Sequence, residues 1–372
     1  MKRGIAIFAA AMLIAAFLLT ACNETAVVPE DGTAVETTAE NIFTAPKNTP
    51  EPISETVTPK GTDLGGIGHG FSDKSLRNEK GVYQVYSGGE LHIGYQITAN
   101  GFVSENGIGL LLLLDGQPQP YRTVENGETR YMHIFHFDEG GRKDVELILT
   151  PVTGKAGDTL ELTGFHVIDP TYYPSEAVMG IMQTNGSAYS GTQLVFQADP
   201  PAAEPLPVTE RVLAQSVETV DLTSGEIAGA SPQSLQESVT FRYSSDHSTF
   251  SGNIYGITRD KPLVLTGEIY GAPMVEWSLI VYVDHQPVTA LPENRIAFHT
   301  ENGKKTVVTM TLDMSDFDGE GIVYGVLCAR NWRDPAVLNS TDSSTEITPT
   351  YYLTDAASYE EMGEKYGWQD PH

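Results

Sequence analysis

The chain has 372 residues, with 49 acidic and 22 basic side chains and a formal net charge of −27. A protein this acidic is repelled by nucleic acids and by anionic lipid surfaces, which excludes both as partners bound through charge. The length is sufficient for two domains of ordinary size.

The first 22 residues have the order of an export signal. Lys2 and Arg3 form a short basic start, and residues 5–19 form an uncharged, apolar run. This run is shorter than the ~20 residues that a membrane-spanning helix needs. Its position after a basic start is typical of a secretory signal, so the sequence predicts export.

The run ends in Leu19-Thr20-Ala21-Cys22, which resembles the lipobox of bacterial lipoproteins. The resemblance implies that the signal peptide, residues 1–21, is removed and that Cys22 carries diacylglycerol. It also implies that the mature chain is held to the extracytoplasmic face of the membrane by this covalent lipid, and two acyl chains are enough for a stable anchor. An ordinary signal peptide cleaved after Ala21 is the alternative.

The sequence has two cysteines, Cys22 and Cys328. If Cys22 is a thioether, Cys328 has no partner for an internal disulfide. Cys328 lies in the apolar run 322–328, and we predict a small buried core residue rather than a reactive thiol.

Residues 22–62 form a compositionally separate segment. It is rich in Thr, Pro, Glu and Ala, and Phe43 is its only aromatic residue. Such a segment cannot bury enough apolar surface to offset the entropy lost on ordering. We predict a disordered tether that holds the folded part away from the membrane.

Short matches in the same order predict an internal repeat. The matched segments are Asp115-Gly116-Gln117-Pro118 with Asp284-His285-Gln286-Pro287, Glu125-Asn126-Gly127 with Glu301-Asn302-Gly303, and Pro170-Thr171-Tyr172-Tyr173 with Pro349-Thr350-Tyr351-Tyr352. We predict two copies of one domain, at residues 63–200 and 205–356, before a C-terminal tail at 357–372. A short helix with Asp355 as its N-cap is expected over residues 355–366.

Each copy is predicted to consist of β-strands, because apolar residues alternate with the period of a strand. The residues expected on one buried face are Ile108, Leu110, Leu112 and Leu114 in copy one, and Val275, Trp277, Leu279, Val281 and Val283 in copy two. Short strands separated by Gly, Pro and Asn favour a β-sandwich. The predicted fold class is all-β, with two tandem sandwiches. Trp277 resembles the core tryptophan of immunoglobulin-like domains, although the cysteine pair of antibody domains is absent.

The sequence predicts no catalytic residue, because it lacks the nucleophile elbow, the phosphate-binding loop, the dinucleotide-binding glycines and the zinc-protease motif. His133 and His136 are three residues apart in a predicted strand and therefore point to opposite faces. They are interpreted as ordinary strand histidines and not as a metal pair. No cofactor is predicted apart from the lipid on Cys22.

One acidic loop is a weak calcium candidate. Its carboxylates are Asp313, Asp316, Asp318 and Glu320. Carboxylates this dense repel one another unless they are solvated or bind a hard cation such as Ca²⁺. The EF-hand pattern fails at Met314, and the matching loop in copy one has only Asp138 and Glu139. We interpret the loop as a solvated turn, with calcium binding as the alternative.

The candidate ligand loop follows Cys328 and contains Arg330, Trp332 and Arg333. Copy two is interpreted as having an insertion here relative to copy one. Loops at the end of a sandwich commonly carry recognition, so Trp332 is a candidate for stacking on a sugar or anchoring a peptide. The alternative is that Trp332 covers the end of its own core.

Three functions are compatible with these features. The leading hypothesis is a non-enzymatic, membrane-anchored surface protein that binds a glycan, a peptide or an envelope protein through sandwich loops. The second is a structural or accessory subunit of an envelope complex, such as a transporter or a pilus. The third is a hydrolase with paired carboxylates at the domain interface.

Overall fold

The fold is that of a computed structural model of the chain. Contacts divide the chain into two compact units, 1–58 and 59–372, and the structure describes residues of the second unit. The described ranges are 66–78, 81–100, 106–137, 141–173, 185–202, 206, 211–229, 240–245, 249–250, 254–273, 275–288, 293–331, 346–347 and 351–366. The predicted signal peptide, Cys22 and the tether lie outside these residues.

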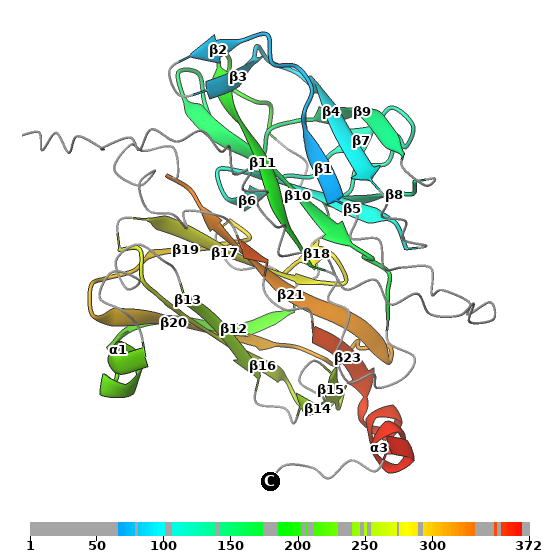
Figure 1. The fold of residues 1–372 in the computed structure, drawn as a ribbon, viewed down its shortest axis with the longest axis vertical. Coiled ribbons are helices and arrows are strands. Elements are labelled where there is room, and N and C mark those ends of the chain that lie inside the picture. Colours follow the sequence, from blue (N-terminus) through cyan, green and yellow to red (C-terminus); the bar gives the residue numbers. More distant parts are fainter. Residues whose placement is uncertain are drawn as a thin grey trace, which may run out of the picture. The chain divides into compact units, whose positions relative to one another are not determined.

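The first half of the described chain forms a β-sandwich of two sheets (Figure 1). The smaller sheet has the order β1 (Gly66–Phe71), β4 (Leu91–Asn100), β9 (Arg142–Leu149) and β7 (Arg122–Thr123). The larger has the order β2 (Arg77–Asn78), β3 (Gly81–Tyr86), β11 (Asn185–Phe196), β10 (Thr159–Ile168), β5 (Ile108–Leu114) and β6 (Gln117–Pro118), and β8 (Met132–Phe135) also pairs with β5.

The second half forms another sandwich. Its smaller sheet has the order β12 (Val212–Asp221), β20 (Lys304–Leu312), β16 (Leu263–Tyr270) and β13 (Thr240–Ser245). The larger has the order β14 (Thr249–Phe250), β15 (Ile254–Ile257), β23 (Tyr351–Asp355), β21 (Glu320–Ala329), β17 (Glu276–Val283) and β18 (Gln286–Pro287), with β19 (Ile296–His299) on β17 and β22 (Glu346–Ile347) on β21. Two short helices, α1 (Ser224–Gly229) and α3 (Ala356–Tyr366), belong to its described residues. The predicted all-β fold class is confirmed.

The alternating apolar positions predicted from the sequence face the interior of each sandwich. Ile108, Leu110, Leu112 and Leu114 belong to the core of the first sandwich. Trp277 is fully buried in the core of the second, together with the alternating residues Val275, Leu279, Val281 and Val283. The period-two interpretation of both segments is therefore confirmed.

The two sandwiches repeat one topology. Along the larger sheets, β2-β3-β11-β10-β5-β6 corresponds strand for strand to β14-β15-β23-β21-β17-β18, and β8 corresponds to β19. The tetrapeptides that begin at Asp115 and Asp284 occupy the same tight turn in each copy. Asp115, Gly116, Asp284 and His285 all have positive φ there. Two successive residues with positive φ make the turn that suits the twist of a hairpin. The predicted repeat is confirmed.

Two of the three sequence matches behind that prediction are wrong as alignments. Glu125-Asn126-Gly127 precedes β8, whereas Glu301-Asn302-Gly303 follows β19, the counterpart of β8. Tyr172 and Tyr173 follow β10, whereas Tyr351 and Tyr352 begin β23, the counterpart of β11. A short motif that favours a turn or fills a core recurs without marking equivalent positions, and only strand pairing fixes the register.

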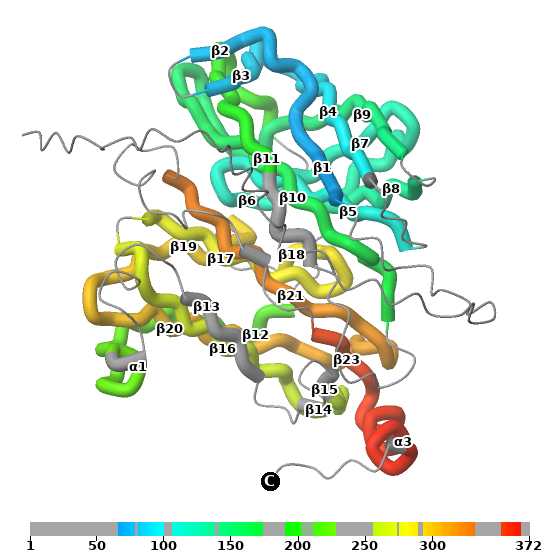
Figure 2. The backbone as a smooth tube through the Cα atoms, in the orientation of Figure 1, coloured from blue at the N-terminus to red at the C-terminus, as the bar shows by residue number. Residues whose placement is uncertain are grey.

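A third apolar layer lies between the two larger sheets. It is formed by Leu111, Leu113, Met132, Phe165 and Val167 of the first sandwich and by Ile280, Tyr282, Ile322, Tyr324, Val326, Cys328 and Tyr352 of the second. The layers are therefore small sheet, large sheet, large sheet, small sheet, and Figure 2 follows the chain from the first pair into the second. Cys328 is buried in this layer, so its prediction as a core residue is confirmed.

Equivalent residues of the two copies meet in this third layer. Leu111 lies opposite Phe165 in the β5–β10 pair, just as Ile280 lies opposite Val326 in the β17–β21 pair. All four side chains belong to the layer. The two copies thus use the same face, as the subunits of a two-fold symmetric dimer do.

The third layer makes a prediction about β5, whose neighbouring residues Leu112 and Leu113 are both buried but on opposite faces. We expect Leu113→Ala to lower the free energy of unfolding by about 2–5 kcal/mol, as much as Leu112→Ala, because each leaves a cavity in a packed layer. Urea denaturation measures both. Val124→Ala, at a side chain that is 63% exposed, is the control and should change it by less than about 0.5 kcal/mol. If Leu112→Ala lowered the free energy of unfolding by this amount and Leu113→Ala did not, the third layer would be contradicted.

Candidate functional site

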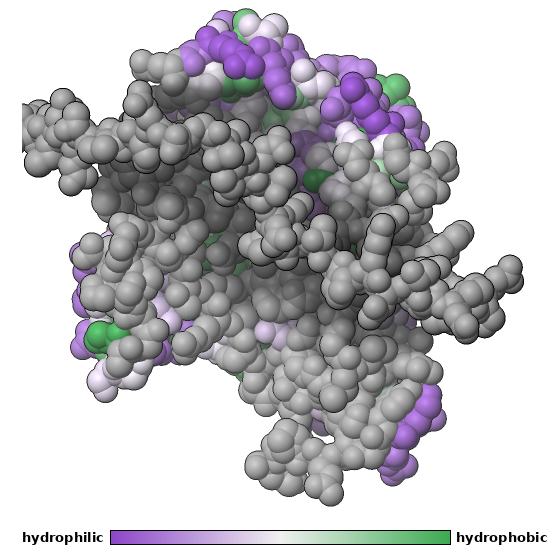
Figure 3. Space-filling model, viewed as in Figure 1, coloured by the Kyte–Doolittle hydropathy of each residue, from purple (hydrophilic) through white to green (hydrophobic). Residues whose placement is uncertain are grey.

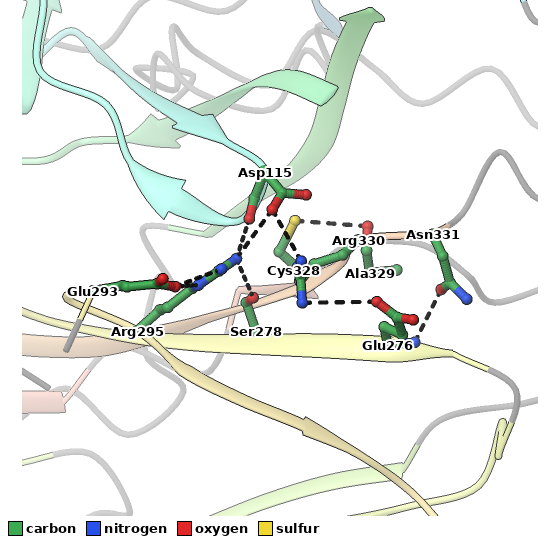
Figure 4. A network of polar contacts seen from close by, with 9 residues as sticks. All are labelled: Asp115, Glu276, Ser278, Glu293, Arg295, Cys328, Ala329, Arg330 and Asn331. Carbon is green, nitrogen blue, oxygen red and sulfur yellow. Dashed lines mark hydrogen bonds and ion pairs between the residues drawn. The ribbon is translucent and has the colours of Figure 1, made fainter. Parts of the chain in front are cut away.

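Arg330 of the predicted ligand loop is engaged in contacts between the sandwiches. Its Nη2 donates to Oδ2 of Asp115 at 2.9 Å, and its backbone N–H donates to the carbonyl of Glu276. Figure 4 shows Asp115 reaching from the first sandwich to Arg330 and Arg295 of the second. These contacts give Arg330 a structural role. Trp332 and Arg333 lie outside the described residues.

Arg295 is the most buried cation in this network, with a side chain only 6% exposed. Its guanidinium ion-pairs with Glu293 at 2.6 Å and with Asp115 at 3.6 Å, and it donates to the backbone carbonyl of Asp115. A buried charge is tolerated only when it is paired and hydrogen-bonded. The Asp115-Gly116 hairpin of the first sandwich therefore fixes Arg295 of the second.

Gly116 is required at this hairpin because its backbone lies close to the opposite sandwich. Its φ is +71°, and a Cβ there would lie 2.6 Å from Oγ of Ser278 in the opposite sandwich. Only glycine allows the backbone to approach so closely in this conformation.

The equivalent hairpin of the second sandwich makes the reciprocal contact. His285 donates from Nε2 to the carbonyl of Pro170 at 2.5 Å, and its Nδ1 accepts from the hydroxyl of Tyr324 at 3.1 Å. Burial lowers the pKa of His285 to about 4, which keeps the imidazole neutral and able both to donate and to accept. Each hairpin tip thus contacts the far end of the other copy's large sheet.

The predicted insertion in copy two is wrong. In the first sandwich, residues 169–184 connect β10 with β11. In the second, β22 and β23 both pair with β21 and together take the place of β11, so residues 330–345 form the equivalent connection. These connections are equal in length. The insertion followed from aligning Tyr172 with Tyr351, which the strand pairing does not support. The connection after Cys328 is a feature of both copies.

The four calcium candidates do not converge. Oδ1 of Asp313 accepts the backbone N–H of Ser315 at 2.9 Å, while Asp318 and Glu320 line a cavity described below. Asp316 is exposed. Within the described ranges, no three His, Cys, Asp or Glu side chains are grouped to hold a metal ion. The solvated turn, with calcium binding as its alternative, stays a prediction.

The match of this acidic loop with Asp138 and Glu139 in copy one is also wrong. The strand order makes the loop between β9 and β10 the counterpart of the loop between β20 and β21. Asp138 and Glu139 instead fall between β8 and β9, outside the described residues.

A cavity of about 900 Å³ lies where the two sandwiches and the C-terminal helix meet. It is lined by Tyr173, Asp318, Gly319, Glu320, Thr354, Asp355, Ser358, Glu361, Met362 and Lys365. Tyr173 is contributed by the first sandwich, and the other residues come from the loop before β21, the first residue of β21, the end of β23 and α3. Four of the lining side chains are carboxylates.

Asp355 starts α3 and so shapes one wall of the cavity. Its Oδ1 accepts the backbone N–H of Ser358 at 2.9 Å, and its Oδ2 accepts the hydroxyl of the same residue at 2.6 Å. This is the N-cap predicted from the sequence, and the predicted helix is confirmed. The two bonds lower the pKa of Asp355, so its carboxylate is charged at neutral pH.

Tyr173 closes the opposite wall as a neutral phenol. Its hydroxyl donates to the carbonyl of Leu353 at 2.6 Å. Burial, with a further contribution from the carboxylates of Glu320 and Asp355, raises the pKa of Tyr173 to about 12. Sequence reasoning missed this residue, because nothing in the sequence indicates that it lies beside α3.

The surface around the cavity is polar. On the face drawn in Figure 3, the described atoms at the place of α3 are hydrophilic, and a small apolar spot lies at the place of α1. Ile227 of α1 is 47% exposed. Within the described part of the chain, no helix has the length and apolar character needed to cross a membrane.

No protein-family model and no curated protein matches the sequence. Solved structures with some similarity include a chimeric tandem of titin Z1Z2 domains, at 9% identity over 73% of this chain and 94% of the other, with a TM-score of 0.18. A putative membrane-anchored protein from Corynebacterium diphtheriae has 8% identity over 73% of this chain and 57% of its own, with a TM-score of 0.21. The Salmonella enterica SafA pilin in complex with the SafB chaperone has 10% identity over 79% of this chain and 98% of the other, with a TM-score of 0.19. Similarity this low carries no argument about the function of this chain.

The contact of His285 makes a prediction about pH. The folded pKa of about 4 lies below the ordinary value of 6.5, so between these pH values the unfolded chain binds this proton more readily. The contribution of neutral His285 to stability is complete above pH 6.5 and is lost as the pH falls towards 4. We expect His285→Asn to lose less stability than the wild type over this interval in urea denaturation. The matched control is His136→Asn at an exposed residue, and equal pH dependence of all three proteins would contradict the assignment.

Proposed function

We propose that the chain is a lipid-anchored, extracytoplasmic protein of the bacterial envelope that has no catalytic role and binds a basic peptide or protein segment. The observation that carries the proposal is the cavity at α3, where four carboxylates face a space large enough for a ligand side chain and its neighbours. The N-terminal sequence Leu19-Thr20-Ala21-Cys22 supports the anchor.

The chemistry of the cavity favours a lysine or arginine side chain. Asp318, Glu320, Asp355 and Glu361 are opposed by a single cation of the lining, Lys365. Tyr173 and Met362 add apolar surface, against which the methylene stem of a lysine or arginine can pack while its charged end meets the carboxylates. Such a site attracts a cation over some distance and orients it on contact.

The rigid joint of the two sandwiches supports the same proposal. Tyr173 reaches the cavity from the first sandwich through its bond to Leu353 of the second. Since the third apolar layer holds the two sandwiches together, the cavity walls are positioned before a ligand arrives. A preformed site loses less entropy on binding than one that must be ordered.

The proposed ligand class is tested with a fluorescein-labelled lysine-rich peptide and its counterpart with glutamate in place of lysine. We expect the lysine peptide alone to bind, with an affinity that falls as salt is added. Glu320→Gln combined with Glu361→Gln should weaken binding about five- to tenfold, because each exposed charge pair contributes up to about 1 kcal/mol. Glu128→Gln combined with Glu218→Gln removes the same charge elsewhere and should leave the affinity unchanged. Equal loss in both double variants would contradict a site at the cavity.

The proposed anchor is tested on the natural product. Mass spectrometry of the membrane fraction should find residues 1–21 absent and diacylglycerol on Cys22. Cys22→Ser should leave the chain without diacylglycerol and with residues 1–21 still attached, since no thioether can form and cleavage follows its formation in the family that the lipobox resembles. A bare sulfur on Cys22 in the natural membrane-bound protein would contradict the anchor and leave the cavity proposal standing.

A further inference from the structure

The two sandwiches differ at one edge of the smaller sheet. β9 and β20 are counterparts, because each pairs along its length with the next strand of its sheet, Leu149 opposite Leu91 and Leu312 opposite Leu263. On the other side, β20 is covered by β12 from Lys304 to Leu312. Among the described strands, β9 is covered only by β7, at Leu147 and Ile148.

The rest of the β9 edge points its main chain outward. The carbonyl of Gly141 accepts the N–H of Ala99 in β4, and main-chain groups alternate sides along an antiparallel strand. The N–H and C=O groups of Arg142, Asp144 and Glu146 therefore face away from β4. Among the described strands, none pairs with these three residues on that side.

The second sandwich shows which kind of strand pairs with the equivalent edge of β20. The counterparts of Arg142, Asp144 and Glu146 are opposed by Val220, Glu218 and Ser216 of β12. Nearly every residue of β12 is exposed, so this strand is held mainly through its main chain and not through a buried face. An edge of this kind binds an extended segment with few demands on its sequence.

The charges along β9 select among such segments. Asp144 and Glu146 are exposed, and Arg142 ion-pairs with Asp144 at 2.8 Å. A strand with the sequence of β12 would place Glu218 opposite Asp144, and like charges directly opposite are unfavourable. A second copy offering its own β12 is therefore disfavoured, whereas basic residues opposite Asp144 and Glu146 are favoured.

We propose that the open edge of β9 from Arg142 to Glu146 binds an extended strand of a partner protein, antiparallel to β9, with basic residues opposite Asp144 and Glu146. The strand takes the position that β12 occupies in the second sandwich. It completes the first sandwich's smaller sheet as β12 completes the other. This edge is separate from the cavity at α3, so each proposal stands or fails independently.

The probe is a fluorescent peptide with the sequence of Val212–Asp221 carrying Ser216→Lys and Glu218→Lys. The full chain carries Glu320→Gln and Glu361→Gln in this experiment, so that the lysines of the probe are not held by the cavity at α3. In fluorescence anisotropy, we expect the probe to bind at least about tenfold more tightly than the unchanged peptide. Methylation of those peptide nitrogens that face β9 should abolish binding, because it removes the main-chain donors. Binding that survives methylation would overturn the proposal.

A matched pair of variants tests the edge itself. Asp144→Pro removes the outward N–H and should abolish binding, whereas Asp144→Ala keeps that N–H and should weaken binding only a few-fold. Amide hydrogen exchange gives a readout that does not depend on the variants. The added peptide should slow exchange at residues 142, 144 and 146 and leave α3 unchanged.

Two outcomes of the exchange experiment would assign the edge to another occupant and overturn the proposal. Amides at 142, 144 and 146 that are already protected in dilute chain alone would mean that the edge is covered within the molecule. Protection that appears only as the concentration of the chain rises would mean that a second copy covers it.

Discussion

The apolar layer between the two larger sheets is the constraint on which the rest of the structure depends. It buries the second face of β5, β10, β17 and β21, so these strands have no solvent-exposed face along most of their length. A sandwich of this size would otherwise expose a large apolar surface, which soluble proteins avoid. Each sandwich therefore completes the other, and the two form one unit and not separate domains joined by a linker.

The polar contacts around this layer fix its register. Apolar packing alone is weakly directional, whereas Asp115 with Arg295 and Arg330, and His285 with the Pro170 carbonyl, each need one geometry. The cavity at α3 depends on that geometry, because Tyr173 is brought to it from the first sandwich. The cavity therefore depends on the same packing that joins the two sandwiches.

The sequence predicts the local structure well and the contacts between distant segments poorly. The inward faces of β5 and β17 follow from period-two alternation, and the N-cap of α3 follows from Asp355. The second buried face of β5 does not follow from alternation, although five successive leucines at 110–114 are typical of a strand buried on both sides. The role of Arg330 and the position of Tyr173 depend on the packing of one copy against the other, for which a single sequence carries no local signal.

The two copies contact each other through equivalent residues, which has a consequence for the evolution of the chain. Leu111 with Phe165 and Ile280 with Val326 present the same face from each copy, as two identical subunits would. The simplest origin is one ancestral sandwich that associated with itself, followed by duplication and fusion of its gene. Fusion replaces a concentration-dependent encounter with a tethered one. Once the halves no longer had to be alike, one hairpin tip could have glycine beside its aspartate and the other the histidine that meets a carbonyl.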